Sequence, residues 1–111
     1  MSENQPQLHH LDCGGHRLAY RLRRGSAPTL LFLPGYASDM DGAKAVALDA
    51  FAGRRGLAML RFDYSGTGLS AGSFAHGTLE RWIDEAQAMA EQLIAGPLIP
   101  IGSSMGGWIA L

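Results

Sequence analysis

The sequence has little of several features that mark particular classes of protein. Its 111 residues contain a single cysteine, Cys13, which cannot form a disulfide within the chain, so nothing points to an oxidising compartment. No apolar run reaches the roughly 20 residues that span a bilayer. Residues 1–12 lack both the apolar core of a secretory signal and the Arg-rich pattern of a transit peptide. These absences predict a cytoplasmic protein with no membrane span.

Neither sign of charge dominates the chain. Nine Lys and Arg against ten Asp and Glu give a formal net charge of −1, and the charged residues are scattered along the sequence. Binding to nucleic acid or to an anionic membrane surface needs concentrated positive charge, so neither partner is expected. The composition, with 47% hydrophobic residues, is that of one ordinary globular domain, and it leaves the oligomeric state open.

Motifs for metals and cofactors are also missing. No His, Cys or Asp cluster has the spacing of metal ligands. Residues 66–72, GTGLSAG, invite comparison with the dinucleotide fingerprint G-x-G-x-x-G, but the third glycine comes one residue late. The loop then continues to Gly77, so no helix begins where a pyrophosphate would need one. The only lysine, Lys44, lies outside any phosphate-loop pattern. We therefore predict no cofactor and no metal.

The sequence does contain an ordered series of predicted elements, and it begins with a β-hairpin. Gly14 and Gly15 suit the positive φ angles of a tight turn within residues 8–24. Residues 16–22 alternate between polar and apolar, as in a strand with one solvent-exposed face. Residues 25–28 are predicted to form a loop.

Three short apolar runs follow, over residues 29–33, 57–62 and 98–101. Continuous apolar runs are typical of strands covered by helices on both faces, and their alternation with helices predicts a parallel α/β sheet. Pro100 cannot donate a backbone hydrogen bond. Either the third strand is short at that point, or the missing N–H faces an unpaired side.

Two helices are predicted between these strands. The first begins with Asp41 as its N-cap and runs to about Arg55, where Gly56 closes it. The second begins with Thr78 as its N-cap and stops at Gly96 and Pro97. The apolar side chains expected to face the core are Val46, Ala47, Phe51 and Ala52 in the first helix, and Leu79, Trp82, Ile83, Ala86, Ala90 and Leu93 in the second.

Two adjacent serines, Ser103 and Ser104, follow the third apolar run. The pattern G-x-S-x-G is satisfied around Ser104, whereas centring it on Ser103 would require glycines at Ile101 and Met105. A sharp turn after a strand holds such a serine up as a nucleophile, and it needs small residues two positions away. The N–H of Met105 then lies at the start of a helix, where it can donate to a developing oxyanion. A turn of small residues could also merely allow close helix packing, but the preceding apolar strand favours the nucleophile.

A second oxyanion donor is predicted in the loop after the first apolar run. The sequence Leu33-Pro34-Gly35-Tyr36 lets the chain turn over the end of the strand at Gly35. The N–H of Tyr36 can then face the same oxyanion as that of Met105. Without Ser104, this stretch would be read only as a turn.

These stretches resemble the α/β-hydrolase superfamily, and within it the mitochondrial palmitoyl-protein thioesterase and acyl-glucuronide esterase group with its bacterial relatives. The resemblance implies an α/β fold in which an antiparallel hairpin leads into parallel strands with flanking helices. It also implies an acyl-enzyme mechanism on small-molecule acyl esters or thioesters, with Ser104 as the nucleophile and the N–H groups of Tyr36 and Met105 as the oxyanion hole. Asp63 resembles a residue that ties down the following glycine-rich loop. The stretches, in the order of the family, are FLPGY (32–36), DGAKA (41–45), RFDYSGTGLS (61–70) and GSSMGGW (102–108).

The family also has a catalytic acid and a histidine after the serine, and residues 105–111 contain neither. We therefore expect residues 1–111 to be an incomplete α/β-hydrolase domain, the N-terminal half truncated after the nucleophile elbow, with residues 1–7 a flexible N-terminus. Ser104 without its base is a weak nucleophile, so this chain is expected to be inactive alone. Whether the gene product or only the sequence is truncated stays open.

Upstream histidines offer little replacement for the missing base. His76 lies in the loop after the second apolar run and is the one candidate near the site. The others, His9, His10 and His16, belong to the hairpin. All four histidines are expected to be exposed or locally hydrogen-bonded, with His76 as the one exception still open. The alternative to a hydrolase is a small non-catalytic α/β module, complete as it stands, that binds a ligand or a partner.

Overall fold

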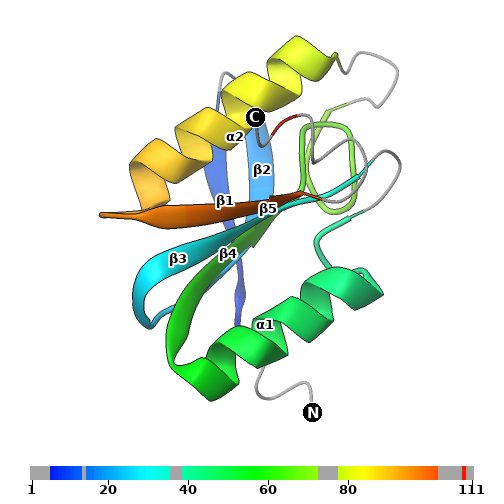
Figure 1. Ribbon diagram of the computed structural model, residues 1–111. Coiled ribbons are helices and arrows are strands. Elements are labelled where there is room, and N and C mark those ends of the chain that lie inside the picture. Colours follow the sequence, from blue (N-terminus) through cyan, green and yellow to red (C-terminus); the bar gives the residue numbers. More distant parts are fainter. Residues whose placement is uncertain (1–5, 14, 36–38, 73–77, 103–108, 110–111) are drawn as a thin grey trace.

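The computed structural model describes residues 6–13, 15–35, 39–72, 78–102 and 109 (Figure 1). Within these residues, five strands form one sheet and two helices pack against it. The predicted sites at Tyr36, Ser104 and Met105 lie outside the described residues, and the predicted flexibility of residues 1–7 stays a prediction. The elements are β1 (Leu8–Cys13), β2 (His16–Arg23), β3 (Ser26–Leu33), α1 (Ala43–Arg55), β4 (Leu57–Phe62), α2 (Leu79–Leu93) and β5 (Leu98–Gly102).

The sheet has the strand order β1-β2-β4-β3-β5. The hairpin strands β1 and β2 are antiparallel, and β2 pairs antiparallel with β4. The pairs β3–β4 and β3–β5 are parallel. The predicted hairpin and the predicted parallel strands are therefore both confirmed, and β2 joins them into one mixed sheet.

The helices cover opposite faces of this sheet, as Figure 1 shows. Alternate residues of β3 point to opposite sides: Leu30 and Phe32 pack with the cluster under α1, whereas Leu31 and Leu33 pack with the cluster under α2. This arrangement confirms that residues 29–33 form a strand buried on both faces. In the described part of the chain, neither helix is long and apolar enough to cross a membrane.

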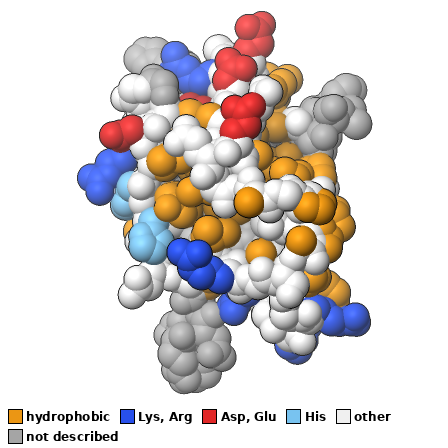
Figure 2. Space-filling model, turned by 90° about the vertical axis from the view of Figure 1, so that its left-hand side faces the viewer, with side chains coloured by type: hydrophobic (Ala, Val, Ile, Leu, Met, Phe, Trp, Pro, Cys, Tyr) orange, Lys and Arg blue, Asp and Glu red, His pale blue; other side chains and the backbone are white. Residues whose placement is uncertain are grey.

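The third apolar run forms a strand, but the prediction that it is buried is wrong. In the described sheet β5 has β3 as its one neighbour, and Ile99 is 46% exposed. The Pro97 carbonyl accepts a hydrogen bond from the Thr29 N–H at 3.1 Å, so the alternation along β5 directs the nitrogen of Pro100 away from β3. The missing donor therefore faces the unpaired side, which is one of the two possibilities that the sequence left open. Figure 2 shows the face of the molecule at the amino-terminal ends of β3 and β5, where hydrophobic side chains gather at the centre.

The loop predicted at residues 25–28 is shorter than expected. The strand β3 already begins at Ser26, which pairs with Leu57 at the start of β4. The Ser26 N–H also donates to the Gly56 carbonyl at 2.8 Å. Propensity reads Ser26 and Pro28 as turn residues, but this pairing with β4 extends the strand, and the register between β3 and β4 is irregular after Ser26.

The start and the buried side of α1 also differ from the prediction. Gly42, not Asp41, is the N-cap, and as a glycine it has no side chain to cap the helix. The carboxylate of Asp41 pairs with Arg21 and Arg61 instead. The buried residues of α1 are Ala45, Asp49 and Ala52. Ala52 is therefore buried as predicted, whereas Val46, Ala47 and Phe51 are exposed. The end of the helix is as predicted. Gly56 takes a left-handed conformation with φ of 69°, and Arg54 and Arg55 occupy the last turn.

The helix α2 begins as predicted, because the Thr78 hydroxyl accepts a hydrogen bond from the Arg81 N–H at 3.1 Å. Trp82 and Ala86 are buried as expected, but Leu79 and Ile83 are exposed. A carboxylate also occupies the face that was expected to be apolar, because Glu85, three residues after Trp82, is buried.

Candidate functional site

The candidate site lies where β3 and β5 end, at the carboxyl edge of the parallel part of the sheet. The register pairs Leu33, the last residue of β3, with Gly102, the last residue of β5. The chain therefore leaves the sheet at neighbouring positions just before the Pro-Gly-Tyr segment and just before Ser103 and Ser104. Carboxyl ends of parallel strands are where α/β proteins place their ligands.

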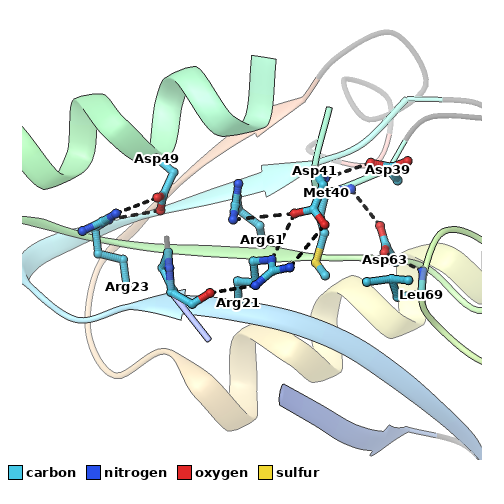
Figure 3. Close-up of polar contacts among 10 residues, drawn as sticks. Arg21, Arg23, Asp39, Met40, Asp41, Asp49, Arg61, Asp63 and Leu69 are labelled. Atoms are coloured by element: carbon cyan, nitrogen blue, oxygen red, sulfur yellow. Dashed lines mark hydrogen bonds and ion pairs between the residues drawn. The ribbon is translucent and has the colours of Figure 1, made fainter. Parts of the chain in front are cut away.

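Asp63 follows β4 at this edge and joins two loops through one carboxylate (Figure 3). One of its oxygens accepts from the Met40 N–H at 2.7 Å, and the other accepts from the Leu69 N–H at 2.9 Å. Asp63 is 1% exposed. Burial raises its pKa above the ordinary aspartate value, although the two N–H donors act in the opposite direction. The expected structural role of Asp63 in the glycine-rich loop is confirmed by the contact to Leu69, and the contact to Met40 extends it to the loop before α1.

Gly68 explains how the glycine-rich loop comes so close to this carboxylate. Its φ is 47°, in the left-handed region, and a Cβ at this position would collide with the carboxylate of Asp63. Ser70 completes the loop: its hydroxyl donates to the Asp63 carbonyl at 2.6 Å and accepts from the Ala19 N–H at 2.7 Å. The loop is therefore built around Asp63.

Tyr64 contacts the first residue of the loop between β3 and α1, whereas Asp63 contacts Met40 near the end of that loop. Its hydroxyl donates to the carbonyl of Pro34 at 3.2 Å. The ring is fully buried, lies edge-on to Phe62 with centroids 5.2 Å apart, and stacks on Trp82 at 5.5 Å. Burial raises the pKa of the Tyr64 hydroxyl, so it stays protonated and remains a donor at neutral pH.

The helix α2 holds this region through the backbone of Ser65. The Glu85 carboxylate accepts from the Ser65 N–H at 2.8 Å, and the indole N–H of Trp82 donates to the Ser65 carbonyl at 3.1 Å. Both side chains are buried, with Glu85 3% exposed. The segment after β4 is thus fixed to α2 on one side and to the loop before α1 on the other.

A second polar network lies between α1 and the sheet (Figure 3). Asp41 accepts from Arg21 at 3.0 Å and lies 3.7 Å from the fully buried guanidinium of Arg61. Burial lowers the pKa of Arg61, while the nearby carboxylates oppose that shift. Asp49 binds Arg23 at 2.8 Å, and this hydrogen bond raises the pKa of Arg23. These ion pairs tie the start and middle of α1 to β2 and β4.

The histidines of the described chain belong to the hairpin, with His9 and His10 in β1 and His16 at the start of β2. β4 and β3 separate the hairpin from β5. His9 stacks on Tyr20, and His10 lines an open hollow of about 390 Å³ together with Asp12 and Arg17. His16 lies 3.3 Å from Arg81. These contacts confirm the local roles expected for the three histidines, whereas His76 lies outside the described residues.

Sequence reasoning missed two residues that organise this region, Tyr64 and Glu85. The spacing of α2 carried a signal for Glu85, because it lies three residues after Trp82 and four before Met89, on the buried side. Tyr64 gave a weaker signal as an aromatic residue directly after a buried strand. Cys13 is half-buried beside the cluster under α2, where it packs as a small apolar side chain, and burial raises the pKa of its thiol.

The sheet order, the two flanking helices and the order of the motifs are those of the N-terminal part of an α/β-hydrolase. The chain is 44% identical over 94 residues to mouse palmitoyl-protein thioesterase ABHD10, mitochondrial, covering 85% of this chain and 32% of that protein. The structure of mouse alpha/beta hydrolase domain-containing protein 10 superimposes with a TM-score of 0.90 at 40% identity, covering 93% of this chain and 42% of the other. A putative hydrolase from Agrobacterium vitis gives a TM-score of 0.87, also at 40% identity, with 94% and 42% covered. No family model matches the chain.

These comparisons confirm the resemblance stated from the motifs. The chain spans about a third of the length of the curated relatives it matches. They also contradict the expected cytoplasmic setting, since the mouse, human and rat relatives are mitochondrial proteins by name. A low cysteine count excludes a disulfide framework, but it does not distinguish between compartments in which disulfides are rare.

Proposed function

We propose that this chain is part of a serine hydrolase that cleaves acyl esters or thioesters through an acyl-enzyme on Ser104. The observation that carries the proposal is the register of β3 and β5. Because Leu33 pairs with Gly102, the Pro-Gly-Tyr segment and the G-x-S-x-G motif begin side by side at the carboxyl edge of the sheet. The likeness to a palmitoyl-protein thioesterase and to a putative hydrolase supports the same chemistry.

The reaction proceeds in two halves. The Ser104 hydroxyl attacks the acyl carbon and gives up its proton to a general base, and the carbonyl oxygen takes the negative charge. The intermediate collapses as the bond to the leaving alkoxide or thiolate breaks and the protonated base gives its proton to that leaving group, which leaves the acyl group on Ser104. Water then attacks this ester in the same way and releases a carboxylic acid. The N–H groups of Tyr36 and Met105 are proposed to stabilise the oxyanion in both halves.

The general base is not among the residues after Ser104 in this sequence. In α/β-hydrolases the acid and the histidine follow the nucleophile in chain order. We therefore propose that residues 1–111 supply the nucleophile and the oxyanion hole, and that they do not turn over esters alone. The proposed substrate is a small-molecule acyl ester or thioester, with a fatty-acyl thioester as the form that the name of the mouse relative suggests.

The test is covalent labelling with a fluorophosphonate probe, which reacts with activated serines. The protein is prepared both as the 111-residue chain and with any segment that its gene encodes after Leu111. We expect labelling at Ser104 in the longer form and its loss in Ser104→Ala. The matched control is Ser103→Ala, which removes the neighbouring hydroxyl.

Three outcomes decide between the readings. Labelling of Ser104→Ala at the level of the unsubstituted protein would end the nucleophile assignment. Loss of labelling in Ser103→Ala alone would show that the motif is centred on the wrong serine. A gene that stops at Leu111, together with a stable and monodisperse product that no probe labels, would favour the non-catalytic binding module.

A further inference from the structure

We propose that Tyr64 and Asp63 are positioning residues for the oxyanion side of the site, because together they hold both ends of the loop between β3 and α1. This inference rests on the proposed function. It concerns the loop of residues 34–40, of which the structure describes both ends. It assigns a role to the two adjacent side chains that directly follow β4.

Tyr64 holds the beginning of this loop. Pro34 is the first residue after β3, and its carbonyl accepts the Tyr64 hydroxyl at 3.2 Å. The hydroxyl cannot move freely, because the ring is fully buried between Phe62 and Trp82. Trp82 is itself held through its bond to the Ser65 carbonyl. The packing of Tyr64 against Trp82 of α2 therefore fixes the position of the Pro34 carbonyl.

Asp63 holds the end of the same loop. Its bond to the Met40 N–H, at 2.7 Å, fixes the chain three residues before α1 begins. Its second oxygen accepts from the Leu69 N–H. The same carboxylate therefore also fixes the glycine-rich loop relative to the loop between β3 and α1. Neighbouring residues on one strand end thus set both ends of a single loop.

Such a double anchor fits the demands of an oxyanion hole. A donor stabilises the developing charge only when it is already in place, since reorganisation during the reaction would reduce the gain. A misplacement of about 1 Å can lower the rate about a hundredfold. The proposed donor, the N–H of Tyr36, belongs to the loop whose ends Pro34 and Met40 mark.

The experiment uses Tyr64→Phe in the longer form of the protein, which includes any segment that the gene encodes after Leu111. The substitution keeps the buried ring and removes only the hydroxyl. We expect the fluorophosphonate labelling rate at Ser104 and the kcat for an acyl ester to fall at least about tenfold, with KM little changed. Tyr20→Phe is the matched control, because Tyr20 is a half-buried tyrosine of β2 that stacks on His9, and it is expected to behave as the unsubstituted protein. Hydrogen exchange of the Met40 and Leu69 amides in Asp63→Asn tests the second anchor, with faster exchange expected at one or both.

The outcomes separate this inference from the proposed function. If Ser104 is labelled equally fast in Tyr64→Phe and in the unsubstituted protein, the positioning role is overturned while the nucleophile stands. If no form is labelled at Ser104, the proposed function fails, and exchange of residues 34–40 alone decides whether Tyr64 anchors them: faster exchange in Tyr64→Phe supports the anchor, and unchanged exchange overturns it. A rise in KM with unchanged kcat would assign Tyr64 to substrate binding and would also overturn the proposal.

Discussion

At the scale of single residues, the buried carboxylate of Asp63 is the clearest case of one side chain serving two segments. Each oxygen accepts one backbone N–H, from Met40 and from Leu69. An amide side chain could accept only one of them, because its nitrogen would face the other donor. The carboxylate is nevertheless costly to ionise in this position, since burial raises its pKa and Asp39 and Asp41 act in the same direction.

The first prediction follows from that raised pKa. The folded protein holds the Asp63 proton more tightly than the unfolded chain, so the stabilising contribution is complete below about pH 4, the ordinary aspartate value, and is lost as the pH rises through the higher folded pKa. Asp63→Asn carries no such proton. We expect the difference in the free energy of unfolding, unsubstituted protein minus Asp63→Asn, to decrease between about pH 4 and pH 7, as measured by urea unfolding across a pH series.

Groups that do not interact with Asp63 contribute equally to both proteins and cancel in this difference. If this difference in the free energy of unfolding instead increased with pH, the folded pKa of Asp63 would be lowered. The two N–H donors would then outweigh burial.

At the scale of elements, α1 shows how a buried charge can reverse an expected helix face. Asp49 is 4% exposed on the inner side, where it binds Arg23 of β2 at 2.8 Å. Val46 and Phe51 lie on the outer side, and the Arg55 guanidinium packs over the ring of Phe51 at 5.1 Å. The sequence prediction placed apolar residues inward, but the small residues Ala45 and Ala52 give the closer approach to β3 and β4, and Asp49 lies between them.

The second prediction concerns this ion pair. Asp49→Ala leaves the Arg23 guanidinium without that carboxylate, and we expect the free energy of unfolding to fall by about 1–2 kcal/mol. That is less than for a fully buried pair, because the side chain of Arg23 is 22% exposed and can turn toward water. The measurement is urea unfolding at neutral pH. Asp84→Ala, at an exposed position of α2, is the matched control and is expected to change stability by less than about 0.5 kcal/mol. Equal effects of the two substitutions would show that the Asp49 pair contributes nothing particular.

At the scale of the whole molecule, the sheet order determines which loops meet. Parallel pairing of β3 with β5 brings the segments after Leu33 and Gly102 together, although 69 positions separate these residues in the sequence (102 − 33). Asp63 and Tyr64, just before the glycine-rich loop, bind Met40 and Pro34 at the two ends of the segment after Leu33. These segments therefore meet because of the strand order, in which β3 lies between β4 and β5.

The third prediction is made for the chain as a whole. Because residues 105–111 contain no histidine and no acid, we expect the 111-residue chain to hydrolyse an acyl p-nitrophenyl ester no faster than Ser104→Ala does. Release of p-nitrophenolate, followed with both proteins at equal concentration, is the measurement. Turnover that depends on Ser104 in this chain would show that a group within residues 1–111 already serves as the base, with His76 as the first candidate.

The sequence by itself determined the features that depend on neighbouring residues. These include the hairpin turn, the Thr78 cap, the Gly56 end of α1 and the G-x-S-x-G motif around Ser104, because cap and turn chemistry acts over three or four positions. It also predicted β3 and β4 as strands buried on both faces, since a continuous apolar run needs cover from two sides.

Only the tertiary structure decided which elements are neighbours. It placed β5 at the end of the described sheet, so that Ile99 is exposed in a run that reads as buried. It gave Asp41 to two arginines in place of a helix cap, and it aimed the Tyr64 hydroxyl at Pro34. Periodicity reports which face of an element is apolar, but the partner of a buried polar group is set by strand order and register, and these depend on residues distant in the sequence.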